Sequence, residues 1–210
     1  KYGDKQSSVM DVTLREGNKQ NHEIKAEANM AGLGLTMEGP LIKNRASYMG
    51  SYKKSFLKYV IKSAGLTAIP EYWNGQTKVV YYINNKEKLT FNFITGDDIV
   101  KVDDESRPDL PNADLVDHHG NQATYGLTYK SLFSSKGYFQ LTLAKSSSEW
   151  NNDIYKIVNG NKNIYMSRNN IEEDSYLKGQ VVYKLTDKVT ISAGFNIKEG
   201  AYSMNERFDE

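Results

Sequence analysis

Large apolar and small polar side chains alternate through residues 88–98, KLTFNFITGDD, until a glycine and two aspartates end the run. A period of two places successive side chains on opposite faces of a β-strand. The same alternation recurs along the chain and predicts an all-β fold of about nine strands. The predicted strands cover residues 24–30, 33–38, 46–53, 77–83, 88–96, 124–129, 139–144, 177–184 and 189–198.

Short and long connections follow one another between these strands. Short turns rich in Asn, Asp, Ser, Gly and Lys occur at 39–44, 84–87, 134–136 and 186–188. Long connections are predicted at 54–76, 97–123 and 146–174. An antiparallel up-and-down meander puts alternate connections at opposite ends of the sheet, and outer-membrane barrels show this asymmetry of short turns and long loops. Because loops of this length are uncommon in compact soluble domains, the connections favour a barrel.

The first long connection is expected to contain a short helix, SFLKYVIKSAG at 55–65. Its apolar residues share one face, with Ser55 able to cap the start and Gly65 the end. Lysines at a spacing of four occupy another face: Lys54, Lys58 and Lys62. The helix either packs on neighbouring loops or presents these lysines to lipopolysaccharide phosphates or an anionic substrate.

Composition narrows the function classes. The 210 residues suffice for one large domain or two small ones. The net charge of +1, from 27 basic and 26 acidic residues, offers no electrostatic case for nucleic-acid binding. The chain has no cysteine, which excludes disulfides and thiolate metal sites. The mean hydropathy of −0.64 does not argue against a barrel, because only alternate strand residues of a barrel meet lipid.

Candidate chemistry is sparse. The chain lacks a phosphate-binding glycine loop and a Gly-x-Ser-x-Gly elbow, and its only histidines are His22, His118 and His119. Asp114 and Asp117 join the last two in ADLVDHHGN at 113–121, a cluster that either chelates a metal or forms a polar loop. A polar loop is the commoner explanation. In the acidic stretch 97–105 we likewise expect solvated charges rather than a metal site. No cofactor, metal ligand or catalytic residue is therefore assigned.

Aromatic residues suit a boundary between water and lipid. The 15 tyrosines combine an apolar ring with a polar tip. Tyr125, Tyr129, Tyr138 and Tyr183 near strand ends are candidates for an aromatic girdle, the alternative being ordinary strand tyrosines. Trp73 and Trp150 in or beside long connections are expected to anchor or pack rather than stack on a substrate.

Four stretches resemble one family. SVMDVTLREGN at 8–18 looks like a short strand at the end of the plug domain of TonB-dependent outer-membrane receptors. IKAEANMAGLGLTMEGPL at 24–41 resembles their first barrel hairpin, and RASYMGSYKKSFLKYVIK at 45–62 the following strand and loop helix of a carboxypeptidase-regulatory-like subgroup. VVYYINNKEKLTFNFITGDD at 79–98 is similar to their next hairpin. The resemblance runs over nearly the whole chain.

The resemblance implies an architecture and a transport function without bond chemistry. Receptors of this family enclose an N-terminal plug in a 22-strand barrel, so residues 1–18 would be the end of the plug and its linker, and 19–210 the first part of the barrel. The implied location is the bacterial outer membrane, with long loops extracellular and short turns periplasmic. The implied partners are outer-membrane lipid, lipopolysaccharide, the TonB protein acting through a region upstream, and an iron chelate, cobalamin, glycan or peptide.

The ends of the chain look cut. It opens with KYGDKQSS, without Met or an apolar signal segment, and closes with GAYSMNERFDE directly after a strand-like run. We therefore expect a fragment of a longer receptor, a mature domain being the alternative.

The barrel hypothesis assigns each strand face. Residues expected to face lipid are Leu89, Phe91, Phe93, Tyr125, Leu127, Phe139, Leu141, Leu143, Val189, Ile191 and Phe195. Residues expected to face the lumen or plug are Thr90, Asn92, Thr128, Gln140, Thr142, Gln180 and Asn196.

Other classes of protein would require different features of this sequence. An outer-membrane barrel enzyme would need a nucleophile beside His118 or His119. A passive porin would have no plug-like segment. A soluble β-sandwich or lipid-carrying barrel would bury Phe91, Leu141 and Ile191 beneath a second layer, an outcome that would remove the transporter hypothesis.

Overall fold

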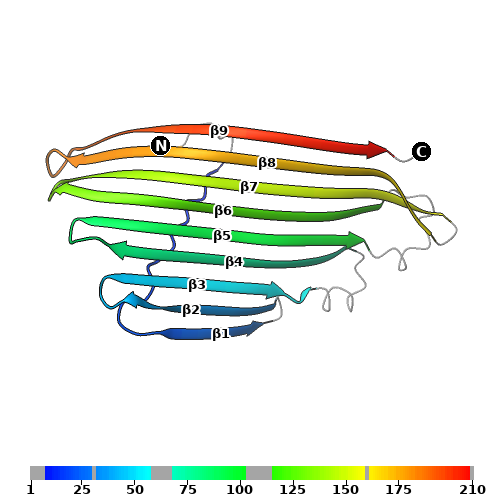
Figure 1. The fold of residues 1–210 in the computed structure, drawn as a ribbon, viewed down its shortest axis with the longest axis horizontal. Helices are drawn as coiled ribbons and strands as arrows, with labels where there is room; N and C mark the ends of the chain where they lie inside the picture. Colours follow the sequence, from blue (N-terminus) through cyan, green and yellow to red (C-terminus); the bar gives the residue numbers. More distant parts are fainter. Residues whose placement is uncertain (1–7, 30–31, 58–67, 103–114, 159–160, 209–210) are drawn as a thin grey trace.

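The computed structural model describes residues 8–29, 32–57, 68–102, 115–158 and 161–208. They form a single nine-stranded antiparallel sheet in which each strand pairs with the next along the chain (Figure 1). The strands are β1 (Glu23–Asn29), β2 (Gly32–Ile42), β3 (Ala46–Ser55), β4 (Ala68–Tyr82), β5 (Glu87–Val102), β6 (Leu115–Ser134), β7 (Gly137–Val158), β8 (Asn161–Lys184) and β9 (Thr190–Phe208). The prediction of an all-β, nine-strand, up-and-down meander is confirmed.

Several strands are much longer than the alternation predicts. β7 has 22 residues and β8 has 24, and they take up almost all of the long connection predicted at 146–174. The connections predicted at 54–76 and 97–123 likewise belong in large part to β4, β5 and β6. These three predictions of long loops are wrong for the residues concerned. Backbone hydrogen bonds to both neighbours hold a polar segment in the sheet even where its side chains do not alternate.

Four short turns lie together at one end of the sheet, as predicted (Figure 1), but the first covers 43–45 rather than 39–44, because residues 39–42 belong to β2. Asn44 adopts a left-handed conformation with φ of 59°, which asparagine tolerates well. The side chain of Asn84 accepts hydrogen bonds from the backbone nitrogens of Lys86 and Glu87, at 2.8 and 3.0 Å. In the last turn, Thr186 Oγ1 accepts one from the nitrogen of Val189 at 3.1 Å. Side-chain caps of this kind favour tight reversals.

The helix predicted at 55–65 falls for the most part on residues 58–67, which lie outside the described residues. Ser55 is the last residue of β3, and its Oγ accepts a hydrogen bond from the nitrogen of Leu57 at 3.1 Å. Within the described part of the chain, no helix is long and apolar enough to cross a membrane.

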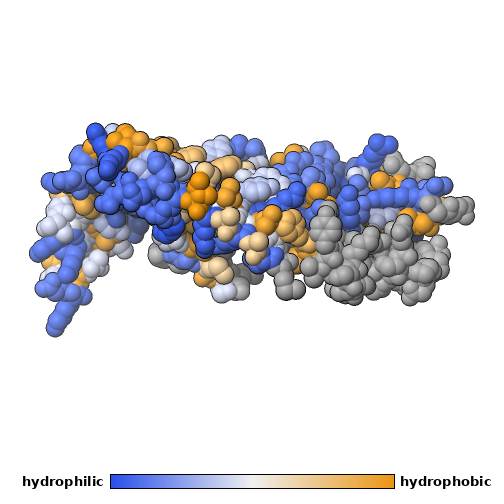
Figure 2. Space-filling view, turned by 90° about the horizontal axis from the view of Figure 1, so that it is seen from below, coloured by the Kyte–Doolittle hydropathy of each residue, from blue (hydrophilic) through white to orange (hydrophobic). Residues whose placement is uncertain are grey.

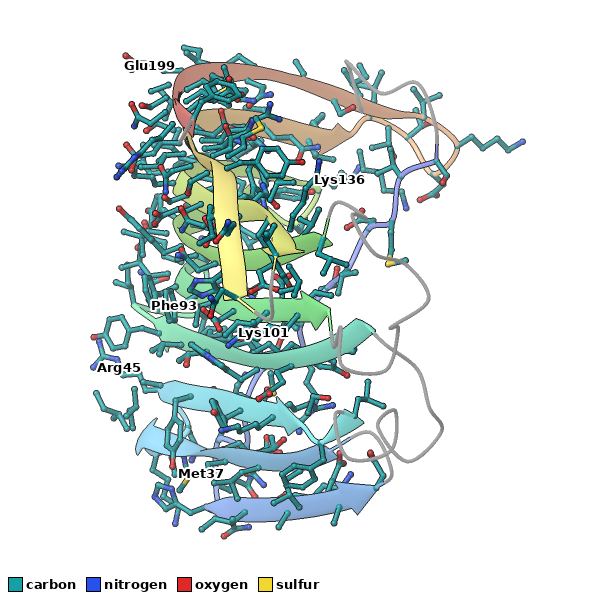
Figure 3. All side chains as sticks on the ribbon, turned by 90° about the vertical axis from the view of Figure 1, so that its right-hand side faces the viewer. Met37, Arg45, Phe93, Lys101, Lys136 and Glu199 are labelled. Carbon is teal, nitrogen blue, oxygen red and sulfur yellow. The ribbon has the colours of Figure 1, made fainter. Side chains whose placement is uncertain are left out.

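Residues 8–22 run across the strands and are not part of the sheet (Figure 1). The prediction of a short strand at 8–18 is therefore wrong. A chain that crosses strands at a steep angle cannot align its amides with a strand edge, so side chains make most of its contacts. Figure 3 shows the sheet as a curved wall, with most of this segment on the side opposite to Met37 and Phe93. At its end, His22 lies against Tyr48 on the side of Met37.

The described residues contain only a small apolar core. Its buried hydrophobic residues are Ala46, Met49, Val80 and Tyr155. Large apolar side chains instead lie at the surface, as the orange patches in Figure 2 illustrate. The sheet therefore does not fold around an interior of its own.

The strand register can be tested where no tight turn sets it. Ser51 of β3 pairs with Gln76 of β4, so the pair Ser51→Cys and Gln76→Cys is expected to form a disulfide in the otherwise cysteine-free chain. The pair Ser51→Cys and Thr77→Cys places the thiols on opposite faces and should stay reduced. Non-reducing gel mobility and peptide mapping of the intact protein measure both, and equal cross-linking of the two pairs would contradict the register.

Candidate functional site

The register divides the sheet into two chemically distinct faces. Phe91 pairs with Leu127, Leu127 with Leu143, and Leu143 with Leu177. Directly paired residues lie on the same face, so this row extends an apolar surface across four strands. We call it the apolar face. It includes all but one of the residues predicted to face lipid: Leu89, Phe91, Phe93, Tyr125, Leu127, Phe139, Leu141, Leu143, Ile191 and Phe195. The exception, Val189, precedes β9 and lies in a turn.

The apolar face is not covered by another layer of the described residues. Phe91 is 38% exposed, Leu141 39% and Ile191 53%. Each strand packs against its neighbours in the sheet, and no second sheet or described helix lies over this face. Contiguous apolar surface of this extent is rare on soluble monomers and marks a site of interaction.

The apolar face forms a band of limited height. On β9 it extends from Ile191 to Ile197, and on β6 from Tyr125 to Phe133. The same face becomes charged beyond the band, where Lys145 forms an ion pair with Glu173 at 2.9 Å. A band of seven to nine residues is close to the roughly 9–11 residues of a tilted membrane-spanning strand.

Aromatic pairs lie at both edges of the band. The ring centroids of Tyr52 and Trp73 are 5.7 Å apart at one edge. Phe133 and Tyr183 stack at 6.2 Å near the short turns. The girdle candidates Tyr125, Tyr129 and Tyr183 belong to this face, whereas the fourth candidate, Tyr138, does not.

Tyr138 pairs with Val182 on the opposite face, and its ring lies 3.9 Å from Lys130 Nζ. Trp150 also lies on that opposite face, paired with Gly120 and Asn170.

The opposite face is polar, and we call it the polar face. It contains every residue predicted to face a lumen: Thr90, Asn92, Thr128, Gln140, Thr142, Gln180 and Asn196. The hydroxyls of Thr128 and Thr142 are 3.0 Å apart. A shallow groove of about 620 Å³ runs over Gln140, Lys178 and Asn196 on this side.

Residues 14–19 are bound to the polar face through Glu16. The hydroxyl of Tyr82 donates to both carboxylate oxygens of Glu16, at 2.8 and 3.0 Å. Lys88 and Lys19 each form an ion pair with Glu16 at 2.9 Å, and Lys19 Nζ lies 3.1 Å from the Tyr82 hydroxyl. One carboxylate thus joins the crossing segment to both β4 and β5.

A second contact joins the segment to β2. Both terminal nitrogens of Arg15 donate to the Glu38 carboxylate at 2.5 Å, and the backbone nitrogen of Asn18 donates to it at 2.9 Å. Lys78 donates to the carbonyl oxygen of Leu14. Bidentate pairing between guanidinium and carboxylate is strong and directional, so it sets the position of the segment. Glu38 is only 6% exposed as a result.

Gly17 allows the segment to approach β3 closely. A Cβ atom at this position would lie 2.0 Å from the backbone oxygen of Tyr48 and 3.2 Å from the nitrogen of Met49. Any side chain would therefore push the segment away from the sheet. We did not identify the run Arg15-Glu16-Gly17-Asn18 from the sequence as the element that attaches the segment to the sheet. The signal available in the sequence was a glycine that follows two charged residues and precedes an asparagine.

The electrostatics of Glu16 follow from these contacts. Burial alone would raise its pKa, but hydrogen bonds from Lys19, Lys88 and Tyr82 outweigh that effect and lower the pKa to about 2. The same contact with Glu16 raises the pKa of Lys19. The pair is therefore ionised at any ordinary pH.

The histidines and acidic residues of the predicted loops are separated by strand alternation. His119 Nε2 lies 2.7 Å from Asp97, whereas His118 lies on the polar face, 2.7 Å from Asn152 and 3.4 Å from Asp98. Asp114 lies outside the described residues, and Asp117 contacts Lys162 instead. Within the described ranges, no three His, Asp or Glu side chains are grouped for a metal ion.

No family model matches the chain, and no curated protein matches it. The functional argument therefore depends on the two faces and on the segment that crosses one of them.

The contacts of Glu16 predict a pH-dependent attachment of the crossing segment. Because the folded pKa of about 2 lies below the ordinary 4.5, the stabilisation is complete above pH 4.5 and is lost as the pH falls towards 2. The difference amounts to at most about 3 kcal/mol. A nitroxide attached through Thr13→Cys should be immobile at pH 6 and gain mobility on acidification.

Glu16→Gln should make the same label mobile at pH 6, as measured by electron paramagnetic resonance. The matched control is Glu27→Gln, which removes a carboxylate from β1 that pairs with Lys25 and not with the segment. Equal mobility in the Glu16→Gln and control proteins would contradict the role given to Glu16.

Proposed function

We propose that this chain forms part of the wall of a transmembrane β-barrel in the bacterial outer membrane, and that the complete protein is a TonB-dependent receptor for nutrient uptake. The observation that carries the proposal is the uncovered apolar band on one face of a nine-stranded meander whose other face is polar and bound to the chain's own N-terminal segment.

Lipid is the solvent that suits the apolar face. Each large apolar side chain left in water forgoes about 1.5–3 kcal/mol of burial free energy. The band presents many such side chains over nine strands, at a height that matches a hydrocarbon layer. Aromatic pairs at its two edges suit the headgroup regions, where rings with polar tips are enriched.

The polar face suits a water-containing lumen. It contains threonine, glutamine and asparagine at the depth of the band, and residues 14–19 lie against it through ion pairs. A segment held inside a barrel wall would be the last part of a plug, in agreement with the division of the chain at residue 18. Movement of a plug would begin with the breaking of the Glu16 and Glu38 contacts.

Closure of the barrel needs further strands. β1 and β9 each have one unpaired edge in the sheet, and lipid does not tolerate unpaired backbone groups. A 22-strand barrel would satisfy both edges. β6 to β9 extend well past the apolar band at the end away from the short turns. In the proposed orientation these extensions are extracellular and would contribute ligand contacts for an iron chelate, cobalamin, glycan or peptide.

An enzymatic function has less support. The described polar partners of the His118 and His119 side chains are Asp97, Asp98 and Asn152, and none of these is a hydroxyl nucleophile. Their positions on opposite faces also prevent the two rings from acting on one substrate.

The membrane assignment predicts that two neighbouring substitutions differ in their effect on insertion into the outer membrane. Leu127→Arg places a charge in the middle of the apolar band and should cost about 2–4 kcal/mol, with loss of the heat-modifiable band from the outer-membrane fraction. Thr128→Arg places the same charge on the polar face and should leave that fraction unchanged. Equal tolerance of the two substitutions in the intact protein would contradict a lipid-facing band.

The transport assignment is tested separately by uptake. Cells that lack this protein should fail to accumulate one nutrient of the classes named above, and cells that lack TonB should show the same loss. Uptake that persists without TonB would favour a passive porin, and it would leave the membrane assignment intact.

A further inference from the structure

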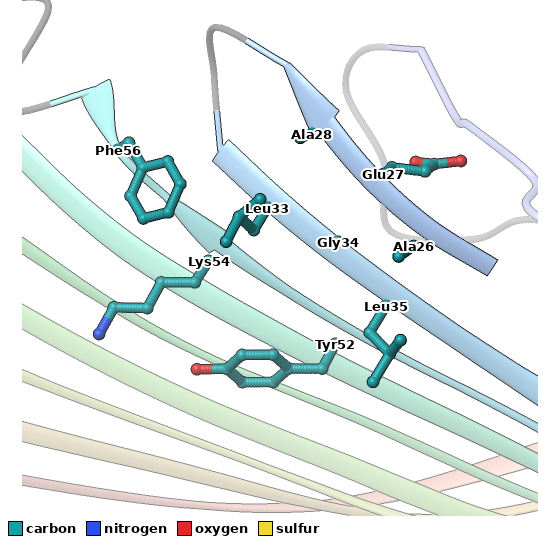
Figure 4. Close-up of a pocket in the computed structure, with 9 residues that line it drawn as sticks. All are labelled: Ala26, Glu27, Ala28, Leu33, Gly34, Leu35, Tyr52, Lys54 and Phe56. Atoms are coloured by element: carbon teal, nitrogen blue, oxygen red, sulfur yellow. The ribbon is translucent and has the colours of Figure 1, made fainter. Parts of the chain in front are cut away.

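A groove of about 480 Å³ crosses the apolar face over β1, β2 and β3 (Figure 4). Ala26 and Ala28 of β1 leave the space open, because their side chains are short. The rings of Tyr52 and Phe56 border it on the β3 side. Its volume lies within the range of about 300–1,000 Å³ that is usual for small-molecule sites.

Lys54 gives this groove a charge at one side. It follows Tyr52 on the same face of β3, and Phe56 comes just after the end of that strand. The paired neighbours of Lys54, Leu33 and Trp73, are both apolar. Figure 4 shows its ammonium group extending away from Ala26 and Leu35. No carboxylate of the described residues forms an ion pair with Lys54.

Two acidic residues lie near Lys54, and neither forms a described ion pair with it. Glu27 borders the groove and forms an ion pair with Lys25. Glu71 occupies the next position beyond Trp73 on the same face of β4, and it has a partner of its own. The groove is thus apolar along its length, with one lysine at its side.

We propose that this groove binds one acyl chain of an anionic, phosphate-bearing lipid, with the headgroup phosphate on Lys54; the proposal rests on the lipid-facing assignment of the apolar face. An amphiphile complements the groove. Its uncharged chain would contact the alanines and the aromatic rings, and its negative end would contact the ammonium group. Lys54 lies where the band ends and the face becomes polar, which is the depth of lipid headgroups.

A peptide fits this groove less well than a lipid. Backbone groups of β2 and β3 are already paired on both edges, so they offer no hydrogen bonds to an incoming chain. A peptide would leave its own amides unsatisfied in an apolar setting, at a cost of several kcal/mol per group. An acyl chain has no such groups.

Trp73 is a reporter at the site, since it pairs with Lys54 and its ring contacts Tyr52. The intact protein, with Trp150 and every tryptophan outside residues 1–210 replaced by Phe, is reconstituted in vesicles that contain brominated phosphatidylglycerol or brominated phosphatidylcholine at the same mole fraction. Bromine on the acyl chain quenches Trp73 fluorescence on contact. The anionic lipid is expected to occupy the site about fivefold more readily, the effect of one lysine at a membrane surface.

Lys54→Gln should abolish this preference while quenching by both lipids continues. Lys53→Gln is the matched control, because Lys53 lies on the polar face of the same strand and its loss should leave the preference unchanged. Ala26→Phe, which fills the groove and keeps Lys54, should reduce quenching by both lipids. Heat-dependent gel mobility verifies that each variant is folded.

The outcomes separate this proposal from the one on which it rests. Quenching by both lipids without preference would overturn the Lys54 site and leave the membrane assignment standing. Quenching by neither lipid would overturn both. Trp73 shielding that depends on protein concentration would assign the groove to a second copy of the chain, and so would also overturn lipid binding.

Discussion

Antiparallel pairing in consecutive order is the constraint on which the rest of the structure depends. Because each strand pairs only with its neighbours in the chain, every side chain is directed to one of two faces. A row such as Phe91, Leu127 and Leu143 is apolar across several strands only because their registers agree. A slip of one residue in any hairpin would move its apolar side chains to the polar face. The short, capped turns at one end prevent such slips.

The two faces require different surroundings, and the polar one is partly provided by the chain itself. Residues 14–19 bring Arg15 and Glu16 to the polar face, where they meet opposite charges on β2 and β5, and Lys19 pairs with Glu16 within the segment. These pairs are half-buried, so each carboxylate depends on several hydrogen bonds to offset the loss of water. Gly17 makes that arrangement possible by allowing the two backbones to approach. The apolar face has no such cover within the described chain, and lipid is the surrounding that we propose for it.

The groove beside Lys54 shows how a uniform band can still contain a specific site. Two alanines on β1 remove volume, and one lysine at the limit of the band adds charge. Neither feature disturbs the backbone ladder, so the sheet can accommodate such a site without loss of strand pairing.

The sequence alone determined the fold class, the meander and the membership of the two faces, because alternation and turn chemistry are local properties. Leu127 and Thr128 could be assigned to opposite faces from their neighbours in the chain. Other features depended on contacts distant in sequence. The full lengths of β7 and β8 come from hydrogen bonds between strands. Tyr138 was one of four girdle candidates, and only the strand register puts it on the polar face. The path of residues 8–22 depends on partners such as Tyr82 and Lys88, more than sixty residues away. Such pairings leave no periodic signal, since the free energy that favours them arises only when the sheet has brought the partners together.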